Sequence, residues 1–577
     1  MKAKHDEMVL VEAEAFDEPG GWVVDQQFMD VMGSPFLLAH GLGEPVEDAA
    51  TKVHLPEAGE YRVWVRTHDW VAPWGAPGAP GRFQVMLDGR ALDAEFGTEG
   101  ADWHWQDGGT VEIEGSTAEL VLRDLTGFEG RCDAILLSRN LDFTPPDDGR
   151  DLAELRESLL GTAEPEDLGA FDLVVCGAGI AGVCAALTAA RRGLTVALVH
   201  DRPVPGGNNS SEVRVWVGGE TRLDPYPHIG DIVAELEPQN RSHYGPGNTG
   251  DLYEDDARIA MLESEPNLAW MPNLHVNGVE MDGDRIGAVR AQHIRTGQKV
   301  LLRPRWVVDA TGHGDVGALA HADHEMTLPG HMGRCNLWHL VDTGKPTEFP
   351  ECPWAFDLSD KPFPGREEQD DSKFGVWFWE SGFDHDPIDE GEYIRDTNFR
   401  AMYGAWDALK NVDGAFPTHK LGWAAYVAGP RESRRLLGDL VIDEDDIIEG
   451  REFDDACVPC TWSIDVHRPD PQYQAGFEGD EFLSVADFTK YQKPWWLPYR
   501  CLYSRNVPNL FMAGRDVSVT HQGLGAVRVM RTTGMMGEVV GLAASLCREH
   551  NADPRDIYEQ HLEAFTAALL AGPPTKE

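Results

Sequence analysis

The sequence predicts an all-β jelly-roll sandwich followed by an α/β Rossmann-like domain that carries an inserted α+β cap. Short apolar runs are evenly spaced through the N-terminal region, a complete strand, glycine-rich turn, helix and strand unit begins at residue 171, and an aromatic-rich segment separates this unit from a last α/β motif. The expected parts are residues 1–142 for the sandwich, 143–170 for a linker, 171–345 and 498–577 for the α/β domain, and 346–497 for the cap.

The N-terminal region alternates apolar runs with Gly, Pro and Asp turns, as in "MVLVEAEAF" and "YRVWVRTHDW". This spacing, without a long helical period, indicates an antiparallel β-sandwich. The segments "VEAEAF", "AGEYRVWVR" and "LVLRDLTGFEGRCDAILLS" resemble carbohydrate-binding modules of the jelly-roll type. The resemblance implies a module that binds sugars.

Four tryptophans, Trp70, Trp74, Trp103 and Trp105, fall in expected loops of this region. An exposed indole stacks on sugar rings, whereas a buried indole fills an interface between domains. We favour docking against the rest of the chain over sugar capture.

The linker, residues 143–170, is polar and acidic, contains prolines and has one short helical pattern. Such a composition is typical of a domain boundary.

The formal net charge is -49, from 98 acidic and 49 basic residues spread along the chain. A diffuse negative surface repels nucleic acid and anionic membranes, so neither is an expected partner. No segment resembles a signal peptide or an apolar membrane span. We expect a cytoplasmic protein that binds a small molecule, and a homo-oligomer stays open.

The unit that begins "FDLVVCGAGIAGVCAALTAARRGLTVALVHD" predicts a dinucleotide site. Gly177 permits a tight turn, Gly179 allows the backbone to approach a pyrophosphate, and Gly182 allows close packing of helix and strand. The helix N-terminus, with Ile180 and Ala181, favours the negative charge of the phosphates. The second strand ends in His200, Asp201 and Arg202, where an acidic residue is expected to hold a ribose; Asp201 is favoured over His200 for that role.

Two later segments follow the same pattern of an apolar strand and a glycine-rich turn: "WVVDATGHGDVGALA" and "VPNLFMAGRDVS". Together with the first unit they resemble the FAD-dependent oxidoreductase family, over residues 171 to about 560. The resemblance implies an FAD-binding domain in two parts and FAD as cofactor, with no metal. It adds further cofactor contacts at Gly207, Asn208, Asn209, Ser210, Ser211, Val276, Ala310, Thr311, Gly312, Gly514, Arg515, Asp516, Gly525 and Val527.

One departure from the family pattern is His313, which stands where an acid is common. No second GxGxxG is present for a nicotinamide nucleotide, so we expect the substrate itself to supply the electrons. The nine cysteines are scattered and suggest no disulfide framework. Cys457 and Cys460 in "CVPC" have redox spacing but fall in an expected extended segment, which does not lower a thiol pKa.

Flavin-dependent oxidation needs a base for the proton of a hydroxyl or amine, and histidine is the usual choice. His521 follows the expected flavin contact Asp516 closely, although Thr520 is an obvious helix cap and His521 could simply lie at the helix start. His467 lies two residues from Asp465, on the same face of an extended chain, so Asp465 could orient it. A surface turn is the alternative for that pair.

The sequence therefore predicts an FAD-dependent oxidase or dehydrogenase that acts on a carbohydrate-like or other polyol or glycoside substrate. Hydride would pass to flavin N5 and a proton to His521 or His467. A reductase or desaturase of the fumarate reductase type, and a carbohydrate-binding scaffold with a structural flavin, are the alternatives. The electron acceptor and the mode of flavin attachment stay open.

Overall fold

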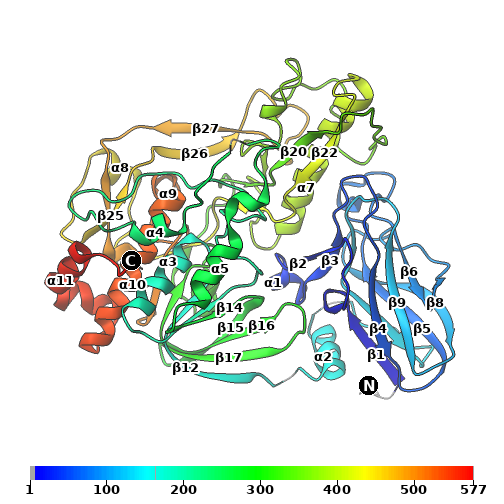
Figure 1. Ribbon diagram of the computed structural model, residues 1–577, viewed down its shortest axis with the longest axis horizontal. Coiled ribbons are helices and arrows are strands. Elements are labelled where there is room, and N and C mark those ends of the chain that lie inside the picture. Colours follow the sequence, from blue (N-terminus) through cyan, green and yellow to red (C-terminus); the bar gives the residue numbers. More distant parts are fainter. Residues whose placement is uncertain (1–6, 148, 163, 243, 576–577) are drawn as a thin grey trace.

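The computed structural model describes residues 7–147, 149–162, 164–242 and 244–575 (Figure 1). An all-β part lies beside a mixed α/β part, and an aromatic-rich part with the helix α7 (Gly391–Asp407) lies above both in the view of Figure 1. Across the described residues, no helix has both the length and the apolar character needed to cross a membrane.

The N-terminal part consists of antiparallel sheets, as predicted. Two four-stranded sheets, ordered β1-β11-β5-β8 and β4-β9-β6-β7, face each other across an apolar core that includes Tyr61, Phe83 and Leu120, and a three-stranded sheet is ordered β10-β3-β2. The jelly-roll connectivity stays a prediction. The strands are β1 (Met8–Glu12), β2 (Val23–Asp25), β3 (Phe36–Ala39), β4 (Ala49–His54), β5 (Gly59–Thr67), β6 (Phe83–Leu87), β7 (Arg90–Ala91), β8 (His104–Ile113), β9 (Thr117–Asp124), β10 (Gly130–Cys132) and β11 (Ala134–Ser138).

The described residues of the linker include a helix and the start of a strand. Its helix α2 (Gly149–Leu160) covers the outer face of the first sheet, where Leu152 packs with Trp64 and Trp105. Trp105 also donates its indole N–H to the carbonyl of Pro146 at 2.8 Å. Strand β12 (Glu166–Cys176) starts inside the expected linker, because it extends the α/β sheet to residue 166.

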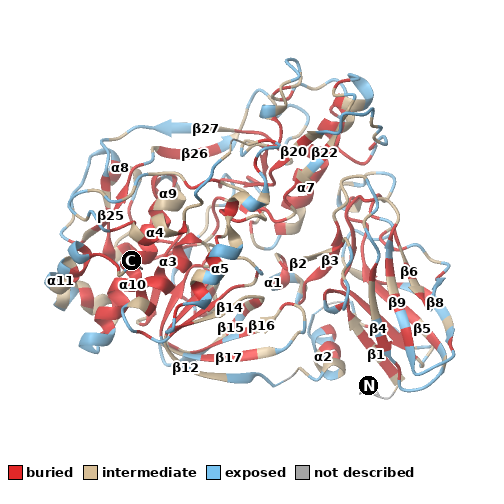
Figure 2. Cartoon of the chain, viewed as in Figure 1, coloured by how far each residue is buried: buried red, intermediate tan, exposed pale blue. Residues whose placement is uncertain are grey.

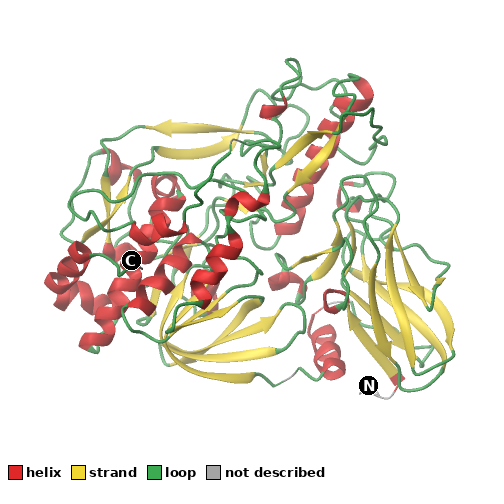
Figure 3. Ribbon diagram, viewed as in Figure 1, coloured by secondary structure: helices red, strands yellow, loops and turns green. Residues whose placement is uncertain are grey.

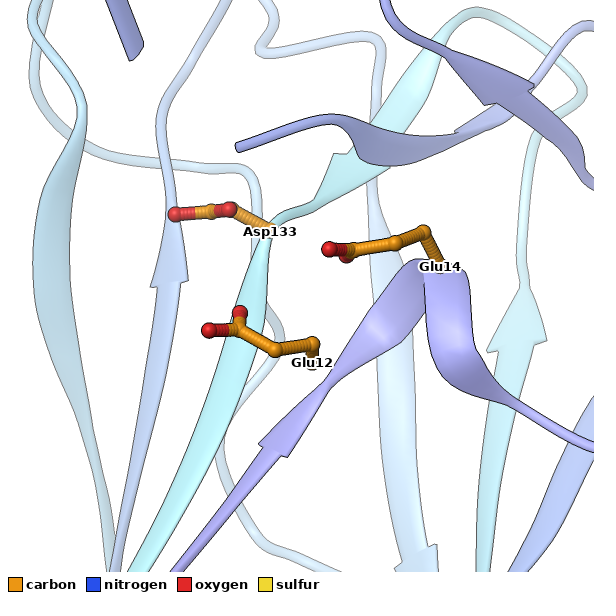
Figure 4. Close-up of side chains that lie close together, drawn as sticks. All are labelled: Glu12, Glu14 and Asp133. Carbon is orange, nitrogen blue, oxygen red and sulfur yellow. The ribbon is translucent and has the colours of Figure 1, made fainter. Parts of the chain in front are cut away.

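A cluster of three buried carboxylates lies where α2 meets the sandwich (Figure 4). Oxygens of Glu12, Glu14 and Asp133 lie within 4.8 Å of one another. Arg66 contacts Asp133 at 2.7 Å, and Arg156 of α2 contacts the same carboxylate. Burial raises the pKa of Glu12 to about 7 and, with Glu12 nearby, the pKa of Glu14 well above its ordinary value. The pair of Arg156 with Asp133 therefore ties the linker helix to the sandwich.

The α/β part is built on a seven-stranded sheet ordered β14-β13-β12-β17-β16-β15, with β29 paired to β17. The strands β14, β13, β12, β17 and β29 are parallel, whereas β15, β16 and β17 form an antiparallel meander. Its strands are β12, β13 (Val196–Val199), β14 (Leu268–Met271), β15 (Leu274–Asp282), β16 (Arg285–His293), β17 (Lys299–Asp309) and β29 (Leu510–Met512). This arrangement confirms the Rossmann-like prediction.

Most helices of this part lie on one face of the sheet (Figure 3), whereas the short helix Asp315–Leu319 packs against the other face. Helices α3 (Ile180–Arg191) and α10 (Met530–His550) pack so closely that both are mostly buried (Figure 2). A Cβ atom at Gly537 of α10 would lie 2.0 Å from the carbonyl oxygen of Ala181, so only glycine fits there. The other helices are α4 (Asp231–Leu236), α5 (Asp255–Glu263), α6 (Asp315–Leu319), α9 (His521–Val527) and α11 (Pro554–Ala571).

The inserted part has its own aromatic core, which includes Trp338, Trp354, Tyr403 and Trp406. Since Trp338 belongs to this core, the inserted part begins before the expected boundary at residue 346. Besides α7 and α8 (Glu444–Ile448), it contains short strands: β18 (His324–Glu325), β19 (Arg334–Cys335), β20 (Trp338–Asp342), β21 (Glu380–Ser381), β22 (His419–Ala424), β23 (Gly429–Pro430), β24 (Arg435–Leu436), β25 (Ala456–Cys460), β26 (Ile464–Pro469), β27 (Ser484–Thr489) and β28 (Trp495–Pro498).

The tryptophan loops of the sandwich dock against this inserted part, as favoured from the sequence. Trp70 is buried in the aromatic core of the inserted part. Trp74 stacks on Tyr393 with ring centroids 4.3 Å apart, and Trp103 donates its indole N–H to Glu392 at 2.9 Å. These three indoles therefore contribute to an interface within the chain.

Buried ion pairs cross the same interface. Arg395 of α7 contacts Asp25 of β2 at 2.6 Å, and both side chains are fully buried. Arg131 of β10 contacts Asp396 of α7 at 2.9 Å. Loss of one partner of such a pair leaves an uncompensated buried charge.

We therefore expect Arg395→Ala to lower the free energy of unfolding by about 3–5 kcal/mol. Urea unfolding followed by tryptophan fluorescence measures the change. Arg150→Ala is the matched control, because the Arg150 side chain is 88% exposed and its pair with Glu154 lies on the surface. Equal stability of the two variants would contradict a stabilising role for the interface pairs.

Candidate functional site

A cavity of about 230 Å³ lies at the carboxyl ends of β12, β13 and β17, where the three predicted glycine-rich turns meet. In open α/β sheets this edge is the usual place for a ligand. Of the residues predicted to bind the cofactor, those that line the cavity are Gly177, Gly179, Ile180, Ala181, His200, Asp201, Arg202, Gly207, Asn208, Val276, Ala310, Thr311, Gly312, Gly514 and Arg515.

The remaining predicted contacts lie behind the wall of the cavity. A Cβ atom at Gly182 would lie 1.8 Å from the carbonyl oxygen of Gly177, and one at Gly525 would lie 2.7 Å from the backbone N of Asp465. Both glycines therefore allow close packing. The residues predicted as cofactor contacts that do not line the cavity are Gly182, Asn209, Ser210, Ser211, Asp516, Gly525 and Val527.

The first turn has the geometry that the sequence predicts. Gly177 has φ +97°, and a Cβ atom there would lie 2.3 Å from the carbonyl oxygen of Ala310. Gly179 is the N-cap of α3, and a Cβ atom there would meet no atom within 4 Å. An open backbone at the start of α3 is a cradle for an anionic group such as a pyrophosphate.

His200 lines the cavity, and its two ring nitrogens differ in their contacts. Its Nδ1 accepts the backbone N–H of Ala178 at 3.2 Å, which leaves the proton on Nε2. Nε2 is buried, and within the described residues it has no hydrogen-bond partner. Burial lowers the pKa of His200 to about 4, so the ring is neutral near pH 7. Asp201 also lines the cavity, and its role as the ribose ligand stays a prediction.

The lowered pKa of His200 predicts a dependence of stability on pH. The ordinary value is 6.5, so between about pH 6.5 and 4 the unfolded chain binds a proton that the folded chain does not. The free energy of unfolding therefore falls with decreasing pH in this window, by up to about 1.4 kcal/mol per pH unit from this group. Urea unfolding of the flavin-free protein should show this slope, and His200→Gln should lose it. If the free energy of unfolding changed with pH in the same way in both proteins, the lowered pKa of His200 would be contradicted.

Asp516, predicted to hold the ribityl chain, is buried behind Gly514 beside Asp309. Asp309 accepts hydrogen bonds from Thr311 and from the backbone N–H of Gly317 at 2.8 Å. Burial and the charge of Asp309 raise the pKa of Asp516 well above its ordinary value.

The features of the cavity fit a dinucleotide: an open helix N-terminus for the phosphates, an unpartnered imidazole N–H, and the ends of three turns along one edge of the sheet. The FAD dependent oxidoreductase family matches the chain over residues 172–343 and 353–569, which is more than half of its length. The chain belongs to this family. FAD is therefore the cofactor of this oxidoreductase.

Three relatives illustrate the similarity. The digeranylgeranylglycerophospholipid reductase 1 of Methanococcoides burtonii is 28% identical over 183 residues, which are 29% of this chain and 43% of that protein, so the match spans less than half of the reductase. A myxobacterial chondrochloren halogenase is 13% identical with TM-score 0.32, covering 70% of this chain and 79% of the halogenase. A family 35 carbohydrate binding module from Clostridium thermocellum is 14% identical with TM-score 0.19, covering 22% of this chain and 96% of the module.

His521, a candidate base of this FAD-dependent oxidoreductase, is the first residue of α9. Thr520 caps the helix by accepting the backbone N–H of Gly523 at 3.1 Å, as predicted. Nδ1 of His521 lies 2.7 Å from the buried carboxylate of Glu432. Although burial acts in the opposite direction, the hydrogen bond from His521 lowers the pKa of Glu432. An ionised Glu432 therefore orients the imidazole through Nδ1, and within the described residues Nε2 of His521 has no hydrogen-bond partner.

His467, the other candidate, contacts carboxylates at both ring nitrogens. Nδ1 lies 2.6 Å from Glu380, and Nε2 lies 3.4 Å from Asp465, the partner expected from the sequence. Glu380 is fully buried and has its pKa lowered to about 2, because the charges of Arg431 and His467 outweigh the effect of burial. His467 is therefore fixed between two carboxylates, which favours a positioning role for it.

Arg528 connects Asp465, and through it His467, to the cavity. It lines the cavity, and its guanidinium lies 3.4 Å from the carboxylate of Asp465. Arg334 also lines the cavity, and burial together with the nearby Arg515 lowers its pKa to about 10. The Nε atoms of Arg334 and Arg528 are buried, and among the described residues neither has a hydrogen-bond partner. His521, His467 and Asp465 lie outside the cavity lining.

Several other side chains have structural contacts. Arg214 lies over the ring of Trp423 at 3.7 Å, and Nδ1 of His339 contacts the carbonyl oxygen of Leu340. Cys457 and Cys460 are buried on β25 as free thiols, and burial raises the pKa of Cys460 to about 12. Such thiols are poor nucleophiles at neutral pH.

Sequence reasoning missed several residues of the site. Glu380 and Glu432 come from segments distant from the two histidines, and no motif marks them as their partners. Gln26, Gln27 and Asp30 of the N-terminal part also line the cavity, and no motif marks them.

Proposed function

We propose that this FAD-dependent oxidoreductase oxidises an alcohol centre, with His521 as the base that takes the hydroxyl proton. The observation that carries the proposal is the pair of His521 with the buried Glu432 at 2.7 Å. A histidine with one nitrogen fixed by a carboxylate and the other nitrogen free is the arrangement that a general base needs. Bound FAD supplies the acceptor for the hydride.

The residues that line the cavity are proposed to hold FAD in order along it. His200 and Asp201 would bind the adenosine ribose, and Gly179 with the first amides of α3 the pyrophosphate. Arg528 would lie toward the flavin end, where it links the cavity to Asp465 and His467. In this arrangement Asp465 and His467 position Arg528, and His521 alone exchanges a proton with the substrate.

The proposed substrate is a carbohydrate-like or other polyol or glycoside. Its support is the resemblance of the N-terminal sandwich to carbohydrate-binding modules. Since Trp70, Trp74 and Trp103 pack inside the chain, they do not support sugar capture by the sandwich surface.

A reductase is the second candidate, and it is favoured by the unpartnered Nε atoms of Arg334 and Arg528 beside the cavity. Two desolvated guanidinium groups suit a carboxylate substrate, and an arginine can donate a proton to a developing carbanion. A relative matched over part of its length is also named a reductase.

Anaerobic absorbance spectroscopy of the flavin distinguishes the two functions. An alcohol oxidase or dehydrogenase bleaches the flavin on addition of members of a panel of polyols and glycosides. A reductase shows no bleaching with that panel, but its dithionite-reduced flavin is reoxidised by unsaturated carboxylic acids. A flavin that responds to neither panel would contradict both functions and favour a structural flavin.

A further inference from the structure

One wall of the FAD cavity comes from the N-terminal part of the chain. The segment after β2, which includes the short helix α1 (Met29–Met32), projects from the sandwich toward the α/β sheet (Figure 1). Gln26, Gln27 and Asp30 of this segment line the same cavity as the glycine-rich turns. The family match begins only at residue 172, so this wall lies outside the matched region.

The segment is fixed on both sides. Gln27 donates its side-chain N–H to the carbonyl of Tyr426 at 3.0 Å and accepts the backbone N–H of Ala428 at 2.7 Å. The preceding Asp25 forms the fully buried pair with Arg395. The wall is therefore held in place by the inserted part as well as by the sandwich.

Asp30 joins the segment to the α/β sheet. Its carboxylate lies 2.8 Å from Nε2 of His275 on β15. The next residue, Val276, lines the cavity, and Leu274 of the same strand donates its backbone N–H to the carbonyl oxygen of His200 at 2.8 Å. The N-terminal segment therefore covers the end of the cavity that is assigned to adenosine.

The side chain of Gln26 has a buried hydrogen-bond donor that indicates a ligand. Its side chain is only 2% exposed, and within the described residues its Nε2 has no hydrogen-bond partner. A buried amide N–H without a partner costs free energy, and such groups in folded proteins are generally satisfied by a ligand or water. Because Gln26 lines the cavity, the partner belongs inside it.

We propose that the N-terminal part completes the FAD site, with Gln26 donating a hydrogen bond to the adenosine half of the dinucleotide and Asp30 and Gln27 holding the segment over it. The sandwich is then a component of the cofactor site. Its contribution is to the retention of FAD, independently of the substrate that the enzyme oxidises.

Gln26→Met tests the proposal in the full-length protein after removal of flavin. Methionine keeps the length of the side chain and removes the unpartnered amide, so the flavin-free protein should be as stable as the wild type or more stable. The dissociation constant for FAD should rise about tenfold, the value of one hydrogen bond. ADP contains the same adenosine half as FAD. Calorimetric titration should therefore show the same tenfold rise in the dissociation constant for ADP.

Gln106→Met is the matched control. Gln106 lies on β8 of the same sandwich, is 8% exposed and has a buried side-chain oxygen without a partner among the described residues, but it does not line the cavity. Its substitution should leave the affinities for FAD and ADP unchanged. Asp30→Asn is a second variant, at a side chain that is 42% exposed, and it should weaken both ligands by about threefold through loss of the pair with His275.

Wild-type affinity for FAD in both Gln26→Met and Asp30→Asn would overturn the proposal. A loss of FAD affinity without a loss of ADP affinity would also overturn it, because the segment would then contact another part of the cofactor. Flavin bleaching by substrate is not used as a readout, so the result does not depend on the proposed reaction.

Discussion

Gly179→Val is expected to give a folded protein that does not bind FAD. Gly179 has an extended backbone with φ -62°, which valine adopts without strain, and its Cβ atom would meet no protein atom within 4 Å. The new side chain would therefore enter the cavity at the N-terminus of α3, where the pyrophosphate is placed. Loss of that contact should weaken the binding of FAD by at least about 100-fold, or roughly 2.7 kcal/mol.

Titration of the flavin-free protein with FAD, followed by quenching of flavin fluorescence, measures this loss. Far-ultraviolet circular dichroism and urea unfolding check that the fold is kept. Gly115→Ala is a suitable control, because a Cβ atom there would have only ordinary contacts at 3.6 Å, far from the cavity. Tight FAD binding by Gly179→Val would contradict the position of the pyrophosphate.

His521→Ala is expected to keep FAD and to lose reduction of the flavin by substrate. Removal of a general base lowers the rate of the chemical step by about 10²- to 10⁴-fold. Thr520 still caps α9, so the helix should be kept. Anaerobic stopped-flow absorbance, with a substrate found in the panel, measures the rate constant for reduction.

His54→Ala, at an exposed position of the sandwich, serves as the control and should reduce at the wild-type rate. Glu432→Gln should give a smaller decrease, because the imidazole stays in place but loses the charge of its partner. Added imidazole should partly restore His521→Ala, which a purely structural role would not allow. A His521→Ala enzyme that reduces normally would show that another residue is the base.

The α/β sheet could be predicted because its signals are local. The segment from residue 171 contains the strand, the turn and the helix in one short unit. The structure confirms the steric need for glycine at Gly177 and Gly182, where a Cβ atom would meet the backbone. The extension of β12 to Glu166 could not be predicted, because Glu166 and Asp167 are acidic and their pairing with β17, including the contact of Asp167 with Arg303, is set by the tertiary structure.

The catalytic candidates were predictable only in part. The sequence shows Thr520 and His521 side by side, so a helix cap and a histidine are both expected. The partner Glu432 is 89 residues away, and only the folded chain brings it to the imidazole. For His467 the near partner Asp465 was predicted, whereas the closer contact with Glu380 depends on the pairing of distant strands.

The N-terminal wall of the cavity had no signal in the sequence. Gln26 and Asp30 lie in a stretch of mixed polar and apolar residues, well before the linker, and the pattern there indicates only a sandwich. The tryptophans Trp70 and Trp74 did indicate an interface, because aromatic side chains gathered in loops must be buried somewhere. Which surface they cover, and that the segment beside it reaches the cofactor, follows only from the tertiary structure.

A crystal structure of the FAD-bound protein is the decisive measurement. We expect the adenosine half beneath Gln26, the pyrophosphate at the backbone of Gly179, and the flavin ring at the Arg528 end, with Nε2 of His521 facing the substrate space beside it. A flavin ring held away from α9, with a different side chain beside its reactive edge, would contradict the assignment of His521 and with it the proposed reaction.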